Sequence, residues 1–202
     1  MAKSSALGIK SLKTRTRILE TARLLFNAQG MEKVSMRQIA ESADMATGNL
    51  TYHYSGKNKL GLALFKQFKT GLEALLERIK LEDDPDQQWE MGLKKLLPFL
   101  VHFRFFFQDF SVLFRISVGA RTAFRQFYPQ VIADLSQWLE SLQEQKLLSS
   151  ELNAKMTAEQ MAAVLFQLAV DEVTLESNDS KLVNHIEQLL RNLLAPHWIQ
   201  QK

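Results

Sequence analysis

Helical periodicity runs through almost the whole chain and leaves little room for other secondary structure. Apolar residues recur at helical intervals, and no segment alternates convincingly with the two-residue period of a half-buried strand. Only 8 glycines and 4 prolines occur among the 202 residues, so few positions oppose a helix. The pattern predicts an all-α protein of about nine helices.

Composition excludes several classes of protein. There is no cysteine, which removes disulfides, thiolate metal sites and cysteine nucleophiles together. The most apolar region, Leu96 to Phe114, is interrupted by Pro98 and by charged and polar residues, whereas a bilayer span needs about 20 mostly apolar residues. Because the first residues also lack the apolar run of a signal peptide, we expect a cytoplasmic protein that contacts no membrane.

Charge is unevenly distributed along the chain. Residues 1–60 hold 10 basic and 4 acidic side chains, whereas residues 61–202 hold 15 basic and 18 acidic ones. A basic N-terminal part joined to a mildly acidic remainder favours contact with a polyanion. Charge alone is equally consistent with a basic segment that is only solvated.

The N-terminal part predicts three helices. The first is expected over Leu12 to Ala28, and Gly30 suits its C-terminal cap because glycine adopts left-handed backbone angles without strain. The second is expected over Met36 to Ser42, with Ser35 as its N-cap. The third is expected over Thr47 to Tyr52.

A tight turn separates the second and third of these helices. Asp44 lies in this turn, and aspartate tolerates left-handed geometry there. Two helices joined by such a short turn have helix-turn-helix geometry. We therefore place a helix-turn-helix domain at residues 1–56.

The remainder, residues 57–202, is expected to form a second helical domain. Its first helix should run from Lys57 to Lys80 with Ser55 as N-cap, before an acidic linker over residues 81–87. Pro98 should kink or stop the next helix. The later helices are expected over Phe103 to Phe114 as one aromatic face, over Phe124 to Leu142, from a capping box at Thr157 and Gln160, and from a cap at Ser180.

The third helix carries the clearest functional signal. A helix that enters the major groove needs short polar residues at its N-terminus, and Thr47, Gly48 and Asn49 meet this need. Leu50 is the inward anchor, and polar groups beside the helix can donate to phosphate oxygens. The candidate DNA-binding residues are Ser35, Arg37, Thr47, Gly48, Asn49, Thr51, Tyr52, His53 and Lys57.

Three ring side chains follow one another at the end of this helix. We expect Tyr54 to pack inward and pin the short helix, while Tyr52 and His53 face the DNA backbone. The alternative is that both tyrosines belong to the core and His53 is merely exposed.

Residues Arg17 to Leu60 resemble the DNA-binding domain of the TetR family of bacterial transcription regulators. The resemblance rests on spacing, residue type and helix order together. The matching positions are Ile18, Leu19, Ala22, Leu25, Phe26, Gly30, Ile39, Ala40, the run Gly48 to Tyr54, and Lys57. Three positions depart from the family pattern: Thr51 replaces a frequent Tyr, Ala46 a frequent capping Ser, and Asp44 a turn Gly. The first departure leaves the operator sequence open.

The resemblance implies a homodimer on a palindromic operator in double-stranded DNA. Family members pair through their last two long helices, which here correspond to residues 157–176 and 180–195. Within the first of these segments, Met161 to Val170 is apolar nearly all round, which is typical of a helix buried on both sides. The expected interface residues are Met161, Leu165, Leu168, Glu172, Ile186, Leu189, Leu190 and Leu193.

The resemblance also implies an effector pocket for a small, largely apolar molecule. The protein would release the operator if the bound ligand tilts the helix that begins at Lys57. The expected lining is Phe103, Phe106, Phe107, Phe110, Phe114, Phe127 and Trp138, with His102 or Arg104 as a polar handle. The alternative is that these rings only fill the core, as aromatic stripes at helical spacing commonly do.

Other functions fit the sequence less well. The four histidines include no pair with metal-binding helical spacing, and no serine lies in a nucleophile elbow, so we expect neither an enzyme nor a bound metal or cofactor. A helical module that binds protein through its N-terminal part is the second alternative, against which the charge distribution argues. An activator would use the same DNA-binding residues as a repressor.

Overall fold

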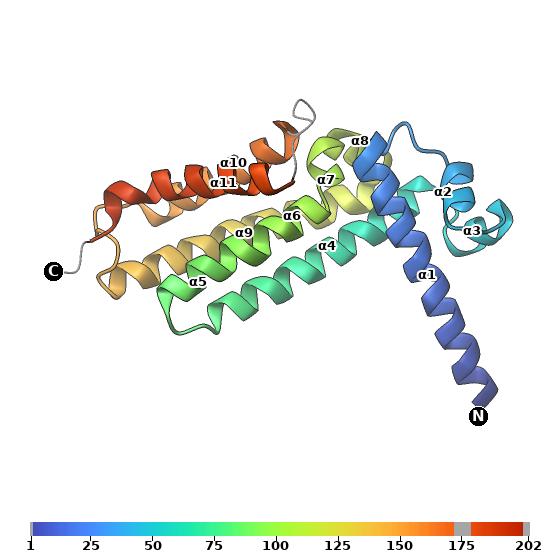
Figure 1. The fold of residues 1–202 in the computed structure, drawn as a ribbon, viewed down its shortest axis with the longest axis horizontal. Coiled ribbons are helices and arrows are strands. Elements are labelled where there is room, and N and C mark those ends of the chain that lie inside the picture. The colour runs from blue at the N-terminus through green and yellow to red at the C-terminus, as the bar shows by residue number, and fades with distance from the viewer. Residues whose placement is uncertain (1, 172–178, 200–202) are drawn as a thin grey trace.

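The protein is all-α, as predicted. The computed structural model describes residues 2–171 and 179–199, and within these ranges the only β-type pairing is an isolated bridge between Leu148 and Trp198. Figure 1 shows a long helical body with a smaller group of helices at one end.

The smaller group, which we call the head, contains α1 (Ala2–Gln29), α2 (Met36–Ser42) and α3 (Thr47–His53). Helix α1 begins ten residues earlier than the apolar pattern predicts and projects beyond α2 and α3 (Figure 1). Among residues 11–29, whose side chains are described, the buried positions start at Ile18, and residues 11–17 are exposed or half-buried. The apolar pattern in the sequence therefore located the packed part of α1 and missed its N-terminal extension.

The body begins with α4 and ends with a short 3₁₀ turn. Helices α4 and α9 run along its length, and α10 and α11 form an outer layer on the side away from α4 (Figure 1). The elements are α4 (Lys57–Lys80), α5 (Pro85–Met91), a π-helical segment (Gly92–Leu96), α6 (Leu97–His102), α7 (Phe105–Gln108), α8 (Phe110–Ile116), α9 (Val118–Glu144), α10 (Ala154–Asp171), α11 (Asp179–Leu194) and the 3₁₀ turn (Ala195–His197).

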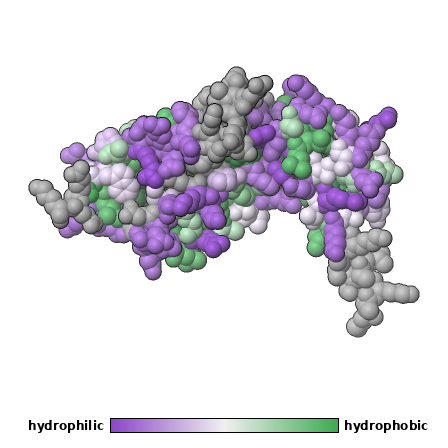
Figure 2. Space-filling model, in the orientation of Figure 1, coloured by the Kyte–Doolittle hydropathy of each residue, from purple (hydrophilic) through white to green (hydrophobic). Residues whose placement is uncertain are grey.

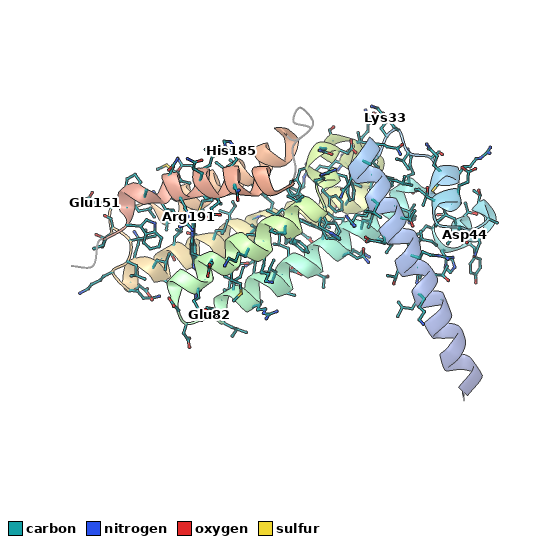
Figure 3. All side chains as sticks on the ribbon, viewed as in Figure 1. Lys33, Asp44, Glu82, Glu151, His185 and Arg191 are labelled. Atoms are coloured by element: carbon teal, nitrogen blue, oxygen red, sulfur yellow. The ribbon has the colours of Figure 1, made fainter. Side chains whose placement is uncertain are left out.

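In the head, the predicted capping and turn residues lie at the helix ends as expected. Ser35 caps α2 through a reciprocal capping box with Gln38. Gly30 has a φ of 81° and Asp44 a φ of 49°, which are the left-handed conformations expected for both turns. Figure 3 labels Asp44 at the turn between α2 and α3.

Three predicted caps in the body were wrong. Gly56, not Ser55, precedes α4, and it makes no side-chain cap. Helix α10 begins at Ala154 because the side-chain oxygen of Asn153 accepts the Met156 N–H at 3.0 Å, which leaves Thr157 buried inside the first turns. Ser180 lies within α11, one residue after its start at Asp179.

The aromatic segment is broken into two short helices rather than forming one. The chain leaves helical geometry at Phe103 and again at Asp109. Side chains of the head bind the backbone at the first break: Arg23 and Asn27 donate to the His102 carbonyl at 2.7 and 2.9 Å. In a continuous helix this carbonyl would accept an N–H from the next turn, and at the break the two side chains take the place of that donor.

Proline explains a second irregularity in the body. The turn just before Pro98 is a π-helix, in which the backbone hydrogen bonds span one more residue than in an α-helix. This change of pattern occurs where proline has no N–H to donate to the preceding turn. Pro129, by contrast, lies inside α9 without ending it.

One hydrophobic cluster joins the head to the adjacent half of the body. It runs from Ile18 and Phe26 in α1 through Phe65 and Phe68 in α4 to Phe127 in α9. The ring of Phe68 lies 5.4 to 6.1 Å from the centroids of five other phenylalanine rings. A second cluster fills the space between α9, α10 and α11.

A substitution of Gly61 should test how closely the head and the body pack. A Cβ atom at this position would lie 2.7 Å from Leu113 Cδ1 and 2.8 Å from Met31 Cε, so Gly61→Ala should lower the free energy of unfolding. Overpacking of this kind costs about 1–3 kcal/mol. Urea unfolding provides the measurement, and Gly92→Ala, whose Cβ would meet nothing within 4 Å, is the matched control. Equal stability of the two variants would contradict the close approach.

Candidate nucleic-acid interface and effector cavity

The outer face of α3 is free of contacts with the rest of the described chain. Thr47, Gly48, Asn49 and Thr51 are exposed, and a Cβ added to Gly48 would meet nothing within 4 Å. Leu50 is fully buried, as expected of the anchor. Thr51, which is exposed, donates its hydroxyl to the carbonyls of Thr47 and Gly48, both at 3.1 Å, and its oxygen can still accept a hydrogen bond.

The structure separates the two tyrosines. Tyr52 is 85% exposed, whereas Tyr54 is 8% exposed and belongs to the core cluster. The prediction that Tyr54 packs inward is confirmed, and the alternative that both rings are core is wrong. The ring of His53, which is half-buried, lies edge-on to Tyr52 at 5.4 Å.

The predicted residues of α2 lie at its exposed beginning. Ser35 is occupied by the capping box with Gln38, and Arg37 pairs with Glu41 at 2.7 Å. Both side chains are solvent-exposed, and a surface pair of this kind is weak enough to exchange for a phosphate.

Lys57 has a structural position that the sequence did not indicate. Its ammonium donates to the carbonyls of Met31 and Glu32, both at 3.0 Å. Lys57 therefore links the start of α4 to the turn between α1 and α2. Because its ammonium is already hydrogen-bonded within the protein, it is not a free cation for a DNA phosphate, as the sequence had suggested.

Asp109 binds the same turn from the opposite side. Its carboxylate accepts the backbone N–H of Met31, immediately after the α1 cap at Gly30. Burial raises the pKa of Asp109, although the Met31 bond and the charges of Lys57 and Lys33 act in the opposite direction. We call the set Asp109, Met31 and Lys57 the junction.

The predicted polar handle of the effector pocket faces the head instead. His102 is exposed, and its carbonyl accepts bonds from α1. Arg104 donates to the Asn27 carbonyl at 3.4 Å, while Asn27 accepts the Phe105 N–H at 3.1 Å. The assignment of His102 and Arg104 to the pocket is corrected: both lie at the contact between head and body.

An apolar cavity of about 60 Å³ lies in the body, lined by residues of α4, α6, α7, α8, α9 and α10. Four predicted residues line it: Phe106, Phe107, Phe114 and Phe127. Phe103 is buried among neighbouring rings without lining this cavity, and the side chain of Phe110 lies outside the described part of the structure. Trp138 lines a separate cavity of about 80 Å³.

Only part of the predicted dimer interface lies on an outer face. Met161 and Leu190 are buried in the second hydrophobic cluster of their own chain, which corrects their assignment to the interface. Leu189 is 36% exposed and Leu193 is half-buried. Glu172 lies outside the described residues, as do the side chains of Leu165, Leu168 and Ile186.

Several residues at the contact between head and body were missed from the sequence. Arg23 is a buried cation on the apolar face of α1, and Asp109 is an acidic residue inside a phenylalanine-rich stretch. Both are out of place in their local pattern, and this signal could have identified them. Asn27 and Gly61 carry no such signal.

Two searches of the described residues, one for a metal-binding cluster and one for a membrane-spanning helix, found neither. Nowhere in residues 2–171 and 179–199 do three or more histidine, aspartate or glutamate side chains gather as a metal site would require. No helix in these ranges is both long and apolar enough to cross a bilayer. On the face drawn in Figure 2, polar residues cover most of the coloured surface.

Three helices with an exposed third helix, set on a helical body that encloses apolar cavities, define a helix-turn-helix protein. Residues 18–64 match the family model described as "Bacterial regulatory proteins, tetR family", and residues 67–201 match the model "Bacterial transcriptional repressor". The second match alone covers more than half of the chain. The chain belongs to the TetR family of bacterial transcriptional regulators.

Curated relatives resemble mainly the first part of the chain. The probable HTH-type transcriptional regulator YttP of Bacillus subtilis is 38% identical over 64 residues, which are 32% of this chain and 31% of YttP. The probable acrEF/envCD operon repressor of Escherichia coli K12 is 32% identical over 81 residues, 39% of this chain and 37% of that protein. The chain thus matches only about a third of the length of these relatives.

Solved structures share the fold along nearly the full chain. A TetR-family regulator from Marinobacter aquaeolei VT8 superposes with a TM-score of 0.80 at 20% identity, covering 92% of this chain and 91% of that one. AibR, solved in complex with isovaleryl coenzyme A and operator DNA, has a TM-score of 0.67 at 17% identity, with 88% and 97% covered. At these identities the likeness establishes the fold alone.

Two substitutions of Asp109 should separate its hydrogen bond from its charge. Asp109→Ala leaves the Met31 N–H without its acceptor, which should cost about 1–3 kcal/mol of unfolding free energy. Asp109→Asn keeps an acceptor without burying a charge, so we expect it to be at least as stable as the wild type at neutral pH. Equal losses in both variants would show that the bond to Met31 contributes nothing.

The same pair predicts a pH dependence. Because the folded protein binds the Asp109 proton more tightly than the unfolded chain does, stability should fall as the pH rises through the raised pKa. The advantage of Asp109→Asn over the wild type should therefore shrink as the pH is lowered below the ordinary carboxyl range. Urea unfolding of both proteins at several pH values provides the measurement.

Proposed function

We propose that the protein is a homodimeric transcriptional repressor that binds a palindromic operator and releases it when a small, largely apolar molecule enters the body. The exposed outer face of α3 carries this proposal. Its residues are short and polar at the N-terminal end, its anchor Leu50 is buried, and nothing in the described chain covers it. Such a surface fits a major groove.

The charge distribution and the relatives support the DNA target. Residues 1–60 carry a net positive charge while the remainder carries a net negative one, so the polyanion should meet the head. Repression is the role named for the Escherichia coli relative, and the structural neighbour AibR was solved with operator DNA.

A dimer would place two recognition helices on one duplex. We expect the outer layer of α10 and α11 to pair with a second copy, with exposed Leu189 among its contacts. Figure 3 labels His185 and Arg191 on α11 in this layer. The two copies of α3 would then reach major grooves roughly 34–36 Å apart, which sets the half-site spacing of the operator.

The junction offers a route by which a ligand could change DNA binding. The cavity residues Phe107 and Leu113 flank Asp109 in sequence, and Asp109 holds the head through Met31. A ligand that displaces α7 or α8 would therefore move the turn that also binds Lys57 at the start of α4. A coupling of about 1–3 kcal/mol would change operator occupancy about 5- to 150-fold.

Selection of bound duplexes from a random or genomic pool would test the proposal directly. A palindromic motif with half-sites one helical turn apart is the expected result, and sedimentation should give two chains per bound duplex. Recovery of no motif, together with affinity that does not change with salt concentration, would instead support a protein-binding module.

Gly48→Ala should weaken DNA binding without harming the fold. The added methyl group meets no protein atom, and alanine favours a helix by about 0.5–1 kcal/mol over glycine, so the melting temperature should not fall. If the backbone of α3 approaches DNA here, operator affinity should drop by about tenfold or more, or ~1.4 kcal/mol. Fluorescence anisotropy with a selected duplex measures this, with Gly92→Ala as control. Unchanged affinity would place the DNA elsewhere.

Asn49→Ala should change sequence preference more than overall affinity. A side chain that reads a base edge contributes about 1–3 kcal/mol of discrimination, so the variant should tolerate changes at one position of each half-site. Competition between the selected operator and single-base variants provides the readout. An equal loss of affinity for every duplex would indicate that Asn49 contacts only phosphate.

A further inference from the structure

The positive charge of the head is concentrated at the beginning of α1 and not in the helix-turn-helix itself. Residues 1–19 contain five basic side chains and no acidic one, whereas residues 20–60 contain five basic and four acidic ones. We call residues 2–17 of α1, which precede the buried Ile18, the arm. Almost all of the excess charge by which the head would attract a polyanion therefore lies on the arm.

Most basic residues of the helix-turn-helix are engaged within the protein. Arg23 is 6% exposed and pairs with Glu20. Lys57 donates its ammonium to two backbone carbonyls, and Arg37 pairs with a carboxylate one turn away at 2.7 Å. Three of the five cations in residues 20–60 therefore already have partners, so α2 and α3 offer DNA mainly uncharged polar groups.

The cations of the arm whose side chains are described have no such partners. Lys13, Arg15 and Arg17 are exposed, and no ion pair within the described chain joins any of them to a carboxylate. A cation that binds a DNA phosphate releases a condensed counterion, and this release drives association. Because these three side chains would break no ion pair on binding, they can contribute this term in full.

Arg15 fixes the position of the arm relative to α3. Its guanidinium carbon lies 5.6 Å from the centroid of the Tyr54 ring, and Tyr54 is the C-cap of α3. A guanidinium that stacks on an aromatic face keeps its N–H groups available at its edges. The arm therefore leaves the head beside the C-terminal end of the helix whose outer face is proposed to meet DNA.

The arm points away from the proposed dimer contact. In Figure 1, α10 and α11 lie along the upper side of the body, and the arm runs downward from the head on the opposite side. With two copies paired through α10 and α11, both arms would extend outward from the dimer axis. From Arg15 to Ala2 a helix rises roughly 20 Å, the length of about six base pairs.

We propose that the arm binds phosphates of the duplex outside each half-site, so that two copies of α3 in the major grooves and two arms on the flanks hold one operator. This inference rests on the proposed function, because α3 on its half-site sets the position of the arm. Phosphate contacts carry no direct sequence information. The flanks should therefore contribute through their length and charge, and not through their sequence.

Replacement of the arm cations tests this contact in the full-length protein. The arm variant exchanges the three described cations for glutamine: Lys13→Gln, Arg15→Gln and Arg17→Gln. The matched control removes the same charge from three exposed lysines of the body: Lys94→Gln, Lys95→Gln and Lys155→Gln. Because all six side chains are exposed, both variants should melt at the wild-type temperature.

Salt dependence gives the first readout. On a selected duplex with flanks of about ten base pairs, the slope of log affinity against log salt should be smaller by about 2–3 in the arm variant, since each phosphate contact contributes about 0.9. Between about 50 and 200 mM salt the wild type should then lose roughly 40-fold more affinity than the arm variant. The body control should keep the wild-type slope. Equal slopes in all three proteins would overturn the proposal.

Flank length gives the second readout. A duplex that ends at the half-sites should bind the wild type and the body control about tenfold or more weakly than the flanked duplex, whereas the arm variant should bind both duplexes alike. Two unrelated flank sequences should give equal affinity. An equal effect of trimming in the arm variant and the control, or dependence on flank sequence, would overturn the proposal. Failure of the wild type to bind any duplex would refute the proposed function, whereas binding that ignores the arm substitutions would refute only this inference.

Discussion

Met31 is the residue through which the head and the body hold one another. Its N–H donates to Asp109 of the body, its carbonyl accepts from Lys57 at the start of α4, and its side chain is fully buried. Gly30 makes this possible, because its left-handed φ of 81° turns the chain out of α1. The orientation of α3 relative to the body therefore depends on the two backbone bonds of Met31, on the bonds between α1 and the backbone at His102 and Phe105, and on the packing around them.

The packing around Met31 explains why the junction is stiff. The close approach at Gly61 brings Leu113 of α8 and Met31 of the head against α4. Polar groups of α1 add bonds to the backbone at His102 and Phe105, where the body helices break. The irregular backbone of the body therefore lies at its contact with the head. The carbonyls and N–H groups that the helix breaks leave unpaired form hydrogen bonds with side chains of α1.

Local sequence signals predicted the regular parts of the fold. They failed where residues distant in sequence determine the backbone conformation. Helices Met36–Ser42 and Lys57–Lys80 have the predicted bounds, because periodicity and turn residues fix them locally. The uninterrupted phenylalanine pattern suggested one helix, yet Arg23 and Asn27, more than seventy positions away in sequence, bind the backbone where it breaks. The exposed face of α3 was predictable for the same local reason.

The body cavity was predicted only in part, since the pattern of rings does not show which of them leave space. Phe106 and Phe127 line the cavity and Phe103 does not, although all three follow the same apolar pattern. His102 and Arg104 were assigned to it because they are polar residues in an apolar segment, whereas their polar groups serve the contact with α1.

The continuous cluster that runs from Ile18 to Phe127 limits how this regulator can be recombined with others. A chimera that exchanges only residues 1–56 would replace Phe26 and Met31 and would leave the body's part of the cluster packed against foreign side chains. The smallest transferable module therefore includes the backbone breaks at 102–109 and the glycine-lined start of α4. Evolutionary exchange of operator specificity in this chain should proceed by substitutions on the surface of α3, which leave that shared interior intact.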